Sequence, residues 1–222
     1  MPHRLLRNGL LLLLVLALGR PAAAQDLLQQ FEPKVTEFTL DNGLTFLVVE
    51  RHEAPVVSFF TYADVGGADE VKGITGMAHM FEHMAFKGTT TIGSKDLEAE
   101  LAAMDEVERI YLELKAEQRK GARADANRLA ALETAFEEAQ ENARSLVENG
   151  EFEKVIERAG GTGLNATTSS DATRYFYSLP ANKTELWFSL EADRFLNPVL
   201  REFYTERDVV MEERRMRTES NP

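Results

Sequence analysis

One five-residue window constrains this chain of 222 residues more than any other feature. Residues 79–83 read H-x-x-E-H, and every other residue of segment 77–86 is apolar. On an α-helix, residues three and four positions apart lie on the same face. His79, Glu82 and His83 would therefore form one narrow polar stripe on a helix that we expect to be buried nearly all round.

Such a stripe is costly to bury unless something satisfies its polar groups. Neutral imidazoles suit zinc, and two of them on successive helical turns can bind the same ion. We therefore predict one Zn²⁺ per chain, with His79 and His83 as ligands. Glu82 is predicted to act as the general base that takes a proton from the zinc-bound attacking water. The alternative is a hydrogen-bonded pair of helices without a metal.

A third ligand must come from elsewhere in the chain, because a catalytic zinc has three protein ligands. The chain has no cysteine, which leaves Asp, Glu or His. The best candidate is Glu213, in a helix predicted over residues 202–217. Its neighbours at i−4, i−3 and i+3 are Val209, Val210 and Met216, so it lies on the side expected to face the core.

Glu206 lies seven residues before Glu213 and therefore on the same helical face. It is about 10 Å away along the helix axis, too far to share the metal. A supporting or substrate-side catalytic role fits it better. The alternative is an exposed first-turn glutamate that the helix dipole stabilises.

The first 24 residues have the three-part pattern of a secretory signal peptide. A basic start is followed by the apolar run 9–18, which is too short to span a bilayer, and by small residues at 21–24. We predict an exported protein, periplasmic or extracellular, with no membrane anchor after cleavage. Cleavage removes three arginines and takes the net charge from −12 to −15. So acidic a protein is a poor nucleic-acid binder, and no nucleic-acid partner is expected.

The remaining pattern predicts an α+β fold, a largely antiparallel sheet flanked by helices. Residues 25–34 form a lead-in, and 35–222 form one domain. A β-hairpin is expected over 35–49 with an Asn-Gly turn, and a helix capped by Thr75 is expected from Gly76 to the Lys87-Gly88 pair. Further strands are predicted at 56–62, 164–167 and 173–179, and further helices at 185–195 and 202–217.

A charged helical hairpin is predicted between about residues 95 and 158, because apolar residues recur there at helical spacing on both sides of Gly121. We treat about 104–157 as an insert in the domain. Such an arm either docks a partner or is a solvated insert without a role, and the sequence leaves both open.

Three ordered segments resemble the insulinase/pitrilysin family of zinc metallopeptidases, which includes mitochondrial processing peptidase. Segment 76–89 resembles its reversed zinc-site signature. Segment 163–168 resembles its substrate-side strand, and segment 206–213 resembles the segment that carries its third ligand. The resemblance runs from about residue 35 to the end of the chain and implies the fold of an N-terminal catalytic half.

The resemblance also implies roles for individual residues. It assigns zinc binding to His79, His83 and Glu213, general-base catalysis to Glu82 and a supporting catalytic role to Glu206. It implies that Asn165 and Ala166 lie on an edge strand that pairs with an extended peptide substrate, and Phe81 is a further predicted substrate contact.

Two departures from the family pattern matter. The second histidine and the third ligand are further apart in sequence than is usual, and the charged insert accounts for the excess. Family members also pair two similar halves, and the second half supplies substrate-binding residues. We therefore expect either a truncated sequence or a chain that needs a homologous partner. The alternative function is a peptide-binding or partner-docking subunit that does not cleave.

Overall fold

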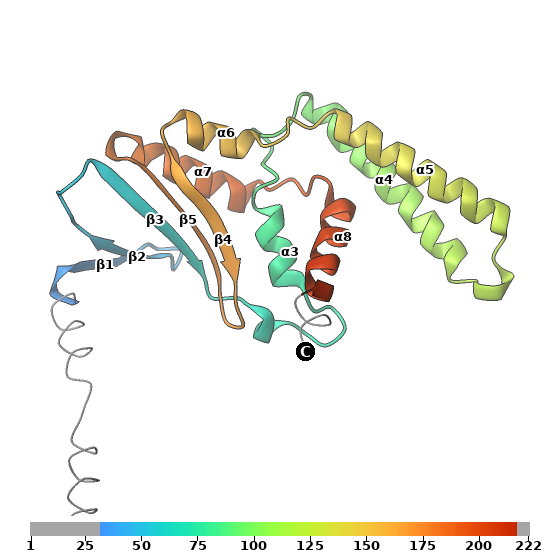
Figure 1. Ribbon diagram of the computed structural model, residues 1–222, viewed down its shortest axis with the longest axis horizontal. Coiled ribbons are helices and arrows are strands. Elements are labelled where there is room, and N and C mark those ends of the chain that lie inside the picture. Colours follow the sequence, from blue (N-terminus) through green and yellow to red (C-terminus); the bar gives the residue numbers. More distant parts are fainter. Residues whose placement is uncertain (1–31, 217–222) are drawn as a thin grey trace, which may run out of the picture. The chain divides into compact units, whose positions relative to one another are not determined.

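The computed structural model describes residues 32–216, which divide into two compact units, residues 32–54 and residues 55–216 (Figure 1). The predicted signal peptide lies outside the described residues. In the first unit, the short helix η1 (Glu32–Lys34) leads into β1 (Val35–Thr39), which pairs antiparallel with β2 (Thr45–Val49). Asn42 Oδ1 accepts a hydrogen bond from the Leu44 amide, and Gly43 has φ +88°, so the predicted Asn-Gly hairpin is confirmed.

The second unit contains a three-stranded antiparallel sheet in the order β3-β5-β4 (Figure 1). Its strands are β3 (Val56–Ala63), β4 (Thr162–Thr168) and β5 (Thr173–Pro180). All three were predicted, although each is longer than its predicted range. Because β5 is central, β4 is an edge strand, and no other described strand pairs with its outer side.

Side chains along β5 alternate between the two faces of the sheet, and those on one face form the main core of this unit. Tyr177 and Leu179 point from the sheet into a cluster with Phe152, Ile156 and Leu190. Helices α6 (Glu151–Arg158) and α7 (Thr184–Leu196) supply the partners on the same face of the sheet. Short helices η2 (Gly67–Asp69) and η4 (Ala181–Lys183) complete the connections.

Two further helices, α3 (Met77–Met84) and α8 (Phe203–Arg214), pack side by side next to β4 (Figure 1). Met80 and Met84 of α3 bury against Val210 of α8. The predicted burial of α3 all round is wrong, because Met77 is 43% and Phe81 54% exposed. Only one side of the helix meets the sheet and α8.

The predicted Thr75 cap of α3 is also wrong. Gly76 is the N-cap residue, with φ +102°, a left-handed conformation that favours glycine. The amides of Gly76 and Ala78 instead donate to the two carboxylate oxygens of Glu70, at 2.7 and 2.8 Å. The carboxylate of Glu70 offers two acceptor oxygens, and its negative charge is stabilised by the positive end of the helix dipole. This explains why Glu70, and not the Thr75 hydroxyl, caps the helix. The Thr75 hydroxyl accepts a hydrogen bond from Arg214.

The predicted charged hairpin consists of α4 (Leu97–Gln118) and α5 (Ala126–Ser145), joined through η3 (Gly121–Arg123). Asp96 and Asp125 cap the two helices through their carboxylates. Of these two helices, α4 has buried apolar residues, among them Val107 and Ile110, whereas α5 has none. In the described part of the chain, no helix combines the length and apolarity needed to cross a bilayer.

Candidate metal centre

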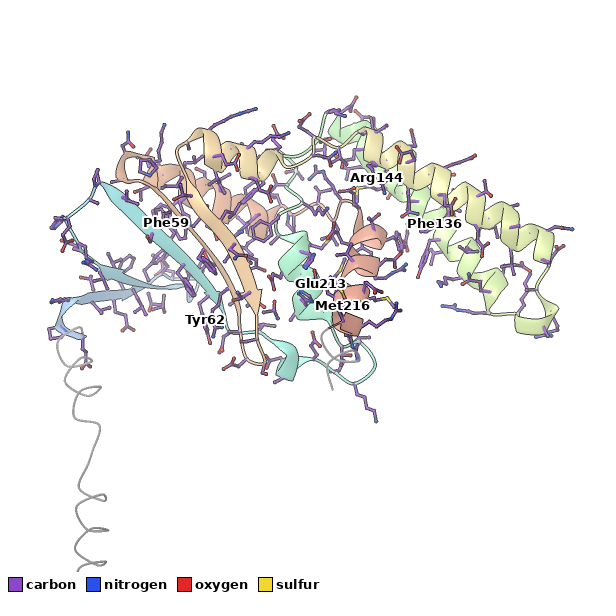
Figure 2. The ribbon with its side chains drawn as sticks, in the orientation of Figure 1. Phe59, Tyr62, Phe136, Arg144, Glu213 and Met216 are labelled. Atoms are coloured by element: carbon purple, nitrogen blue, oxygen red, sulfur yellow. The ribbon has the colours of Figure 1, made fainter. Side chains whose placement is uncertain are left out.

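His79, His83 and Glu213 converge between α3 and α8. Each offers one possible ligand atom, and these three atoms lie within 4.8 Å of one another. His79 Nε2 is 3.5 Å from Glu213 Oε2, and the two imidazole rings stand nearly perpendicular with their centroids 4.8 Å apart. All three side chains are half-buried. Figure 2 labels Glu213 on α8, beside α3.

This donor set fits zinc. Two imidazole nitrogens and one carboxylate oxygen are its usual ligands at catalytic sites. Ligand atoms about 2.1 Å from zinc at tetrahedral angles are about 3.4 Å apart, close to the separation of His79 Nε2 and Glu213 Oε2. The structure therefore brings His79, His83 and Glu213 close together, and their role as metal ligands stays a prediction.

Glu206 contacts His83 rather than the position between the three candidate ligands. Its Oε2 lies 3.0 Å from His83 Nδ1. Because an ionised carboxylate can only accept, Nδ1 carries the proton and Nε2 is the ring atom left for a metal. This carboxylate–histidine arrangement fixes the tautomer and orientation of a metal-binding imidazole.

Lys87 holds the other side of Glu206. Its ammonium group lies 2.6 Å from Glu206 Oε1 and 3.0 Å from Glu202 Oε2. Burial by itself would raise the pKa of Glu206, but the hydrogen bonds from Lys87 and His83 outweigh it, and the pKa lies below its ordinary value. Burial likewise would lower the pKa of Lys87, but its two carboxylate partners raise that pKa above the ordinary value. The ion pair therefore keeps both groups charged.

Glu82 lies on the same arc of α3, and its Oε2 accepts a hydrogen bond from the Thr168 hydroxyl on β4. A cavity of about 290 Å³ opens beside it. Glu82, His83 and Glu206 line one side of this cavity, and Asn165 and Ala166 of the edge strand line the other. The structure therefore brings the predicted base next to the predicted peptide-binding strand.

One detail of the sequence-based prediction needs correction, and the predicted substrate contact of Phe81 stays a prediction. Phe81 does not line this cavity and lies on the exposed side of α3. Around Glu213, only Val210 is buried, whereas Val209 is 42% and Met216 56% exposed. Figure 2 shows Met216 at the end of α8. The α8 face toward α3 is therefore narrower than helical periodicity alone predicts, because α8 packs on a single neighbouring helix there.

Sequence reasoning missed three polar residues that support the site: Glu70, Lys87 and Thr168. Lys87 lies four residues after His83, so helical spacing could have found it. Glu70 lies in the turn before α3 and Thr168 on a distant strand, and the sequence analysis did not single out either as a support of the site. A larger cavity of about 500 Å³ lies between the helical hairpin and the start of α8, and it contains none of the predicted site residues.

Comparison with known proteins then decides the family. A sequence model described as Insulinase (Peptidase family M16) matches residues 45–107 and 141–222. The chain belongs to the insulinase family. The unmatched residues 108–140 of this insulinase-family chain lie in the α4–α5 hairpin.

Individual relatives agree. The chain is 30% identical over 217 residues to zinc protease PqqE of Helicobacter pylori, a match that covers 96% of this chain and 35% of the relative. A crystal structure of a protease from Helicobacter pylori matches with a TM-score of 0.55 and 29% identity, over 85% of this chain and 32% of that one. The first half of the periplasmic protease PqqL from Escherichia coli has the same fold, with a TM-score of 0.51 and 20% identity over 83% of this chain and 30% of that one. This insulinase-family chain thus spans about a third of the length of these proteins.

Proposed function

We propose that this chain is the catalytic half of a zinc-dependent endopeptidase. The observation that carries the proposal is the convergence of His79, His83 and Glu213 on the helix pair that also carries Glu82. Glu82 and His83 line a cavity that borders an edge strand. Family membership and the named zinc protease among its relatives support the same conclusion.

In this proposal His79, His83 and Glu213 hold one Zn²⁺. Bound zinc would act as a Lewis acid that polarises the scissile carbonyl and lowers the pKa of water. Glu206 accepts a hydrogen bond from the Nδ1–H of His83 and so leaves the other ring nitrogen, Nε2, free for the ion. Lys87 orients Glu206 and prevents it from turning into the site.

Glu82 is the proposed general base. One of its carboxylate oxygens is held by Thr168, and the other is available to accept a proton from the water that attacks the peptide carbonyl. The same carboxyl group can then pass this proton to the departing amine. Both proton transfers require the Glu82 carboxylate to lie within hydrogen-bond reach of the reacting atoms. Glu82 lines the cavity in which the water and the peptide would bind.

The edge strand β4 is the proposed peptide-binding element. An extended peptide can add to a free sheet edge through backbone hydrogen bonds, which suits substrates of varied sequence. Asn165 and Ala166 would then place the scissile bond next to Glu82. Phe81 lies away from this edge, so any contact between Phe81 and substrate would come from outside the β4 cavity.

We further propose that activity needs a homologous second half. The chain spans about a third of its relatives, and one solved neighbour is described as the first half of its protease. Export through the signal peptide at 1–24 and a single domain over 35–222, with its insert at about 104–157, also remain proposals. The periplasmic location stated for one protein of the same fold agrees with export.

The proposed mechanism is tested by Glu82→Gln. Zinc-loaded protein, supplied with its second half, is expected to lose at least about 100-fold in peptide hydrolysis, because a general base contributes about 10²–10⁴-fold. Its zinc content should stay at the wild-type level, since Glu82 is not a ligand. Hydrolysis that survives this substitution would refute the mechanism, and a wild-type protein that binds zinc and peptide without cleaving would be a binding subunit instead.

A further inference from the structure

The contact between Glu82 and the edge strand has a consequence for catalysis. Thr168 ends β4, and its hydroxyl donates to Glu82 Oε2. Ala166 and Thr168 are two residues apart on the strand, so both face the side on which α3 lies. The residue that touches the proposed base therefore belongs to the same short strand that would hold the peptide.

The direction of this hydrogen bond follows from its surroundings. The Thr168 oxygen is also 3.5 Å from the hydroxyl oxygen of Thr173, its partner on β5. Thr173 is buried and donates its only hydroxyl proton to the carbonyl of Val65 at 3.0 Å. With that proton committed, Thr173 can only accept, and the ionised carboxylate of Glu82 is the stronger acceptor for Thr168.

We propose that Thr168 is a positioning residue that aims the Glu82 carboxylate at the attacking water. This inference rests on the proposed peptidase function. The last torsion of a glutamate side chain is soft, so packing alone does not fix the plane of its carboxylate. The hydrogen bond to Oε2 fixes that plane and leaves Oε1 for the proton of the water. The neutral hydroxyl does this without adding a charge beside the zinc ligands.

The anchoring of Thr168 explains why it can hold Glu82 in place. Residues 166–168 pair in register with residues 173–175 of the central strand. The side chain of Thr168 is half-buried between β5 and α3, and the carbonyl of Val65 in turn fixes Thr173. A base positioned by a rigid strand is held more accurately than one positioned by a loop.

The test compares Thr168→Val with Thr168→Ser in the zinc-loaded enzyme with its second half present. Valine keeps the shape and β-branching of threonine and lacks only the hydroxyl. We expect kcat to fall roughly 10- to 100-fold in the valine variant with KM unchanged, because misplacing a catalytic group affects the transition state and not substrate binding. Serine should restore most of kcat, and zinc content should match the wild type in both.

Thr162→Val is the matched control, since Thr162 starts the same strand, is exposed and lies outside the cavity. A wild-type kcat in Thr168→Val, or a loss that serine does not rescue, would overturn the proposal. So would a rise in KM with kcat intact, which would make Thr168 a substrate contact. Glu82→Gln in the same assay separates the two ideas, because it loses activity if the peptidase mechanism holds, whatever Thr168 does.

A second measurement does not depend on activity. The Tm values of wild type, Thr168→Val, Glu82→Ala and the double variant form a double-mutant cycle. We expect the double variant to lose less than the sum of the two single losses, because either substitution already removes the same hydrogen bond. Additive losses would show that the two side chains are not coupled and would contradict the inference.

Discussion

At the scale of single residues, the carboxylate of Glu206 connects the candidate metal site to the half-buried ammonium group of Lys87. One of its oxygens accepts from His83 and the other from Lys87. The chain thus has two layers of side chains around the predicted metal, an inner one that would bind the ion and an outer one that orients it.

Glu206→Gln is expected to weaken zinc binding roughly 10- to 100-fold, the usual effect of losing such an outer partner. The amide has a single acceptor oxygen and no negative charge, so it cannot accept hydrogen bonds from both His83 and Lys87 as the carboxylate does. The His83 ring would therefore be held less firmly. Competition with a zinc chelator measures the affinity. Glu212→Gln, an exposed glutamate on the same helix, is the control and should bind zinc like the wild type. Equal affinities of the two variants would contradict the role of Glu206.

Asp193 is expected to make stability depend on acid pH. Burial by itself would raise the pKa of Asp193, but hydrogen bonds from Thr89, Thr91 and Asn197 outweigh it and hold that pKa below its ordinary value. A depressed pKa means that the ionised form stabilises the fold above the unfolded-state pKa of about 3.9, and that this stabilisation is lost as the pH falls below it.

Thermal unfolding of Asp193→Asn across pH 2.5–6 tests this expectation, with Asp208→Asn as the exposed control. The Asp193 variant should be less stable than the wild type near pH 6, and the difference should shrink below about pH 4. A difference that is the same at every pH would exclude the carboxylate charge as its cause.

The sequence predicted the site residues that a helical face or a family motif marks, and it missed polar partners that carry no such mark. His79, Glu82 and His83 follow from helical spacing alone, and Glu213 followed from the need for a third ligand. Thr168 reaches Glu82 across the fold, and Glu70 reaches the start of α3 through the shape of the turn before it. Periodicity does not contain that information.

At the scale of elements, α8 is held from two sides. One side carries Glu206 and Glu213 toward α3, and Tyr204 and Arg207 face the helical hairpin. Tyr204 lies 4.3 Å from Tyr111 of α4 and 5.2 Å from Phe136 of α5, measured between ring centroids, and Arg207 lies over both tyrosines. Figure 2 labels Phe136 on the hairpin. The hairpin therefore braces the helix that brings two carboxylates to the site.

Tyr111→Ala is expected to lower the free energy of unfolding by about 1–3 kcal/mol. It removes two aromatic contacts, the cation–π contact with Arg207 and the hydrogen bond that Arg207 donates to the Tyr111 hydroxyl. Denaturant unfolding followed by circular dichroism measures the change. Leu112→Ala, which removes a mostly exposed neighbour on the same helix, should cost less than about 0.5 kcal/mol. Equal effects of the two substitutions would show that the aromatic junction does not stabilise the hairpin against α8.

The elements themselves were largely predictable, and their arrangement was not. Apolar and β-forming residues between turn signals predicted each strand of the described residues, and apolar residues at helical spacing predicted both helices of the hairpin. The central position of β5 depends on pairings across more than a hundred residues, such as Val56 with Pro180, that no local pattern reveals. The error at Thr75 has the same origin, because the acceptor that replaces it comes from Glu70 on a separate turn.

At the scale of the whole molecule, the site faces outward through an open edge. The β4 edge and the cavity beside Glu82 lie on the surface of the unit formed by residues 55–216, and a catalytic cleft needs a second wall to exclude water and hold substrate. A homologous second half would supply that wall.

We expect this chain alone to cleave a fluorogenic peptide library at least about 100-fold more slowly than the same chain mixed with its second half, since substrate positioning contributes factors of that size. Zinc content should not differ between the two samples. Full activity of the isolated chain would contradict the need for a second half.

The central claim is that His79, His83 and Glu213 hold one metal ion, and elemental analysis of purified protein tests it most directly. After zinc supplementation and dialysis, the account predicts one zinc per wild-type chain, a strong loss in His79→Ala, His83→Ala and Glu213→Ala, and full retention in Glu212→Gln. A wild-type protein without zinc, or a double His79→Ala, His83→Ala variant that keeps the wild-type zinc content, would contradict it.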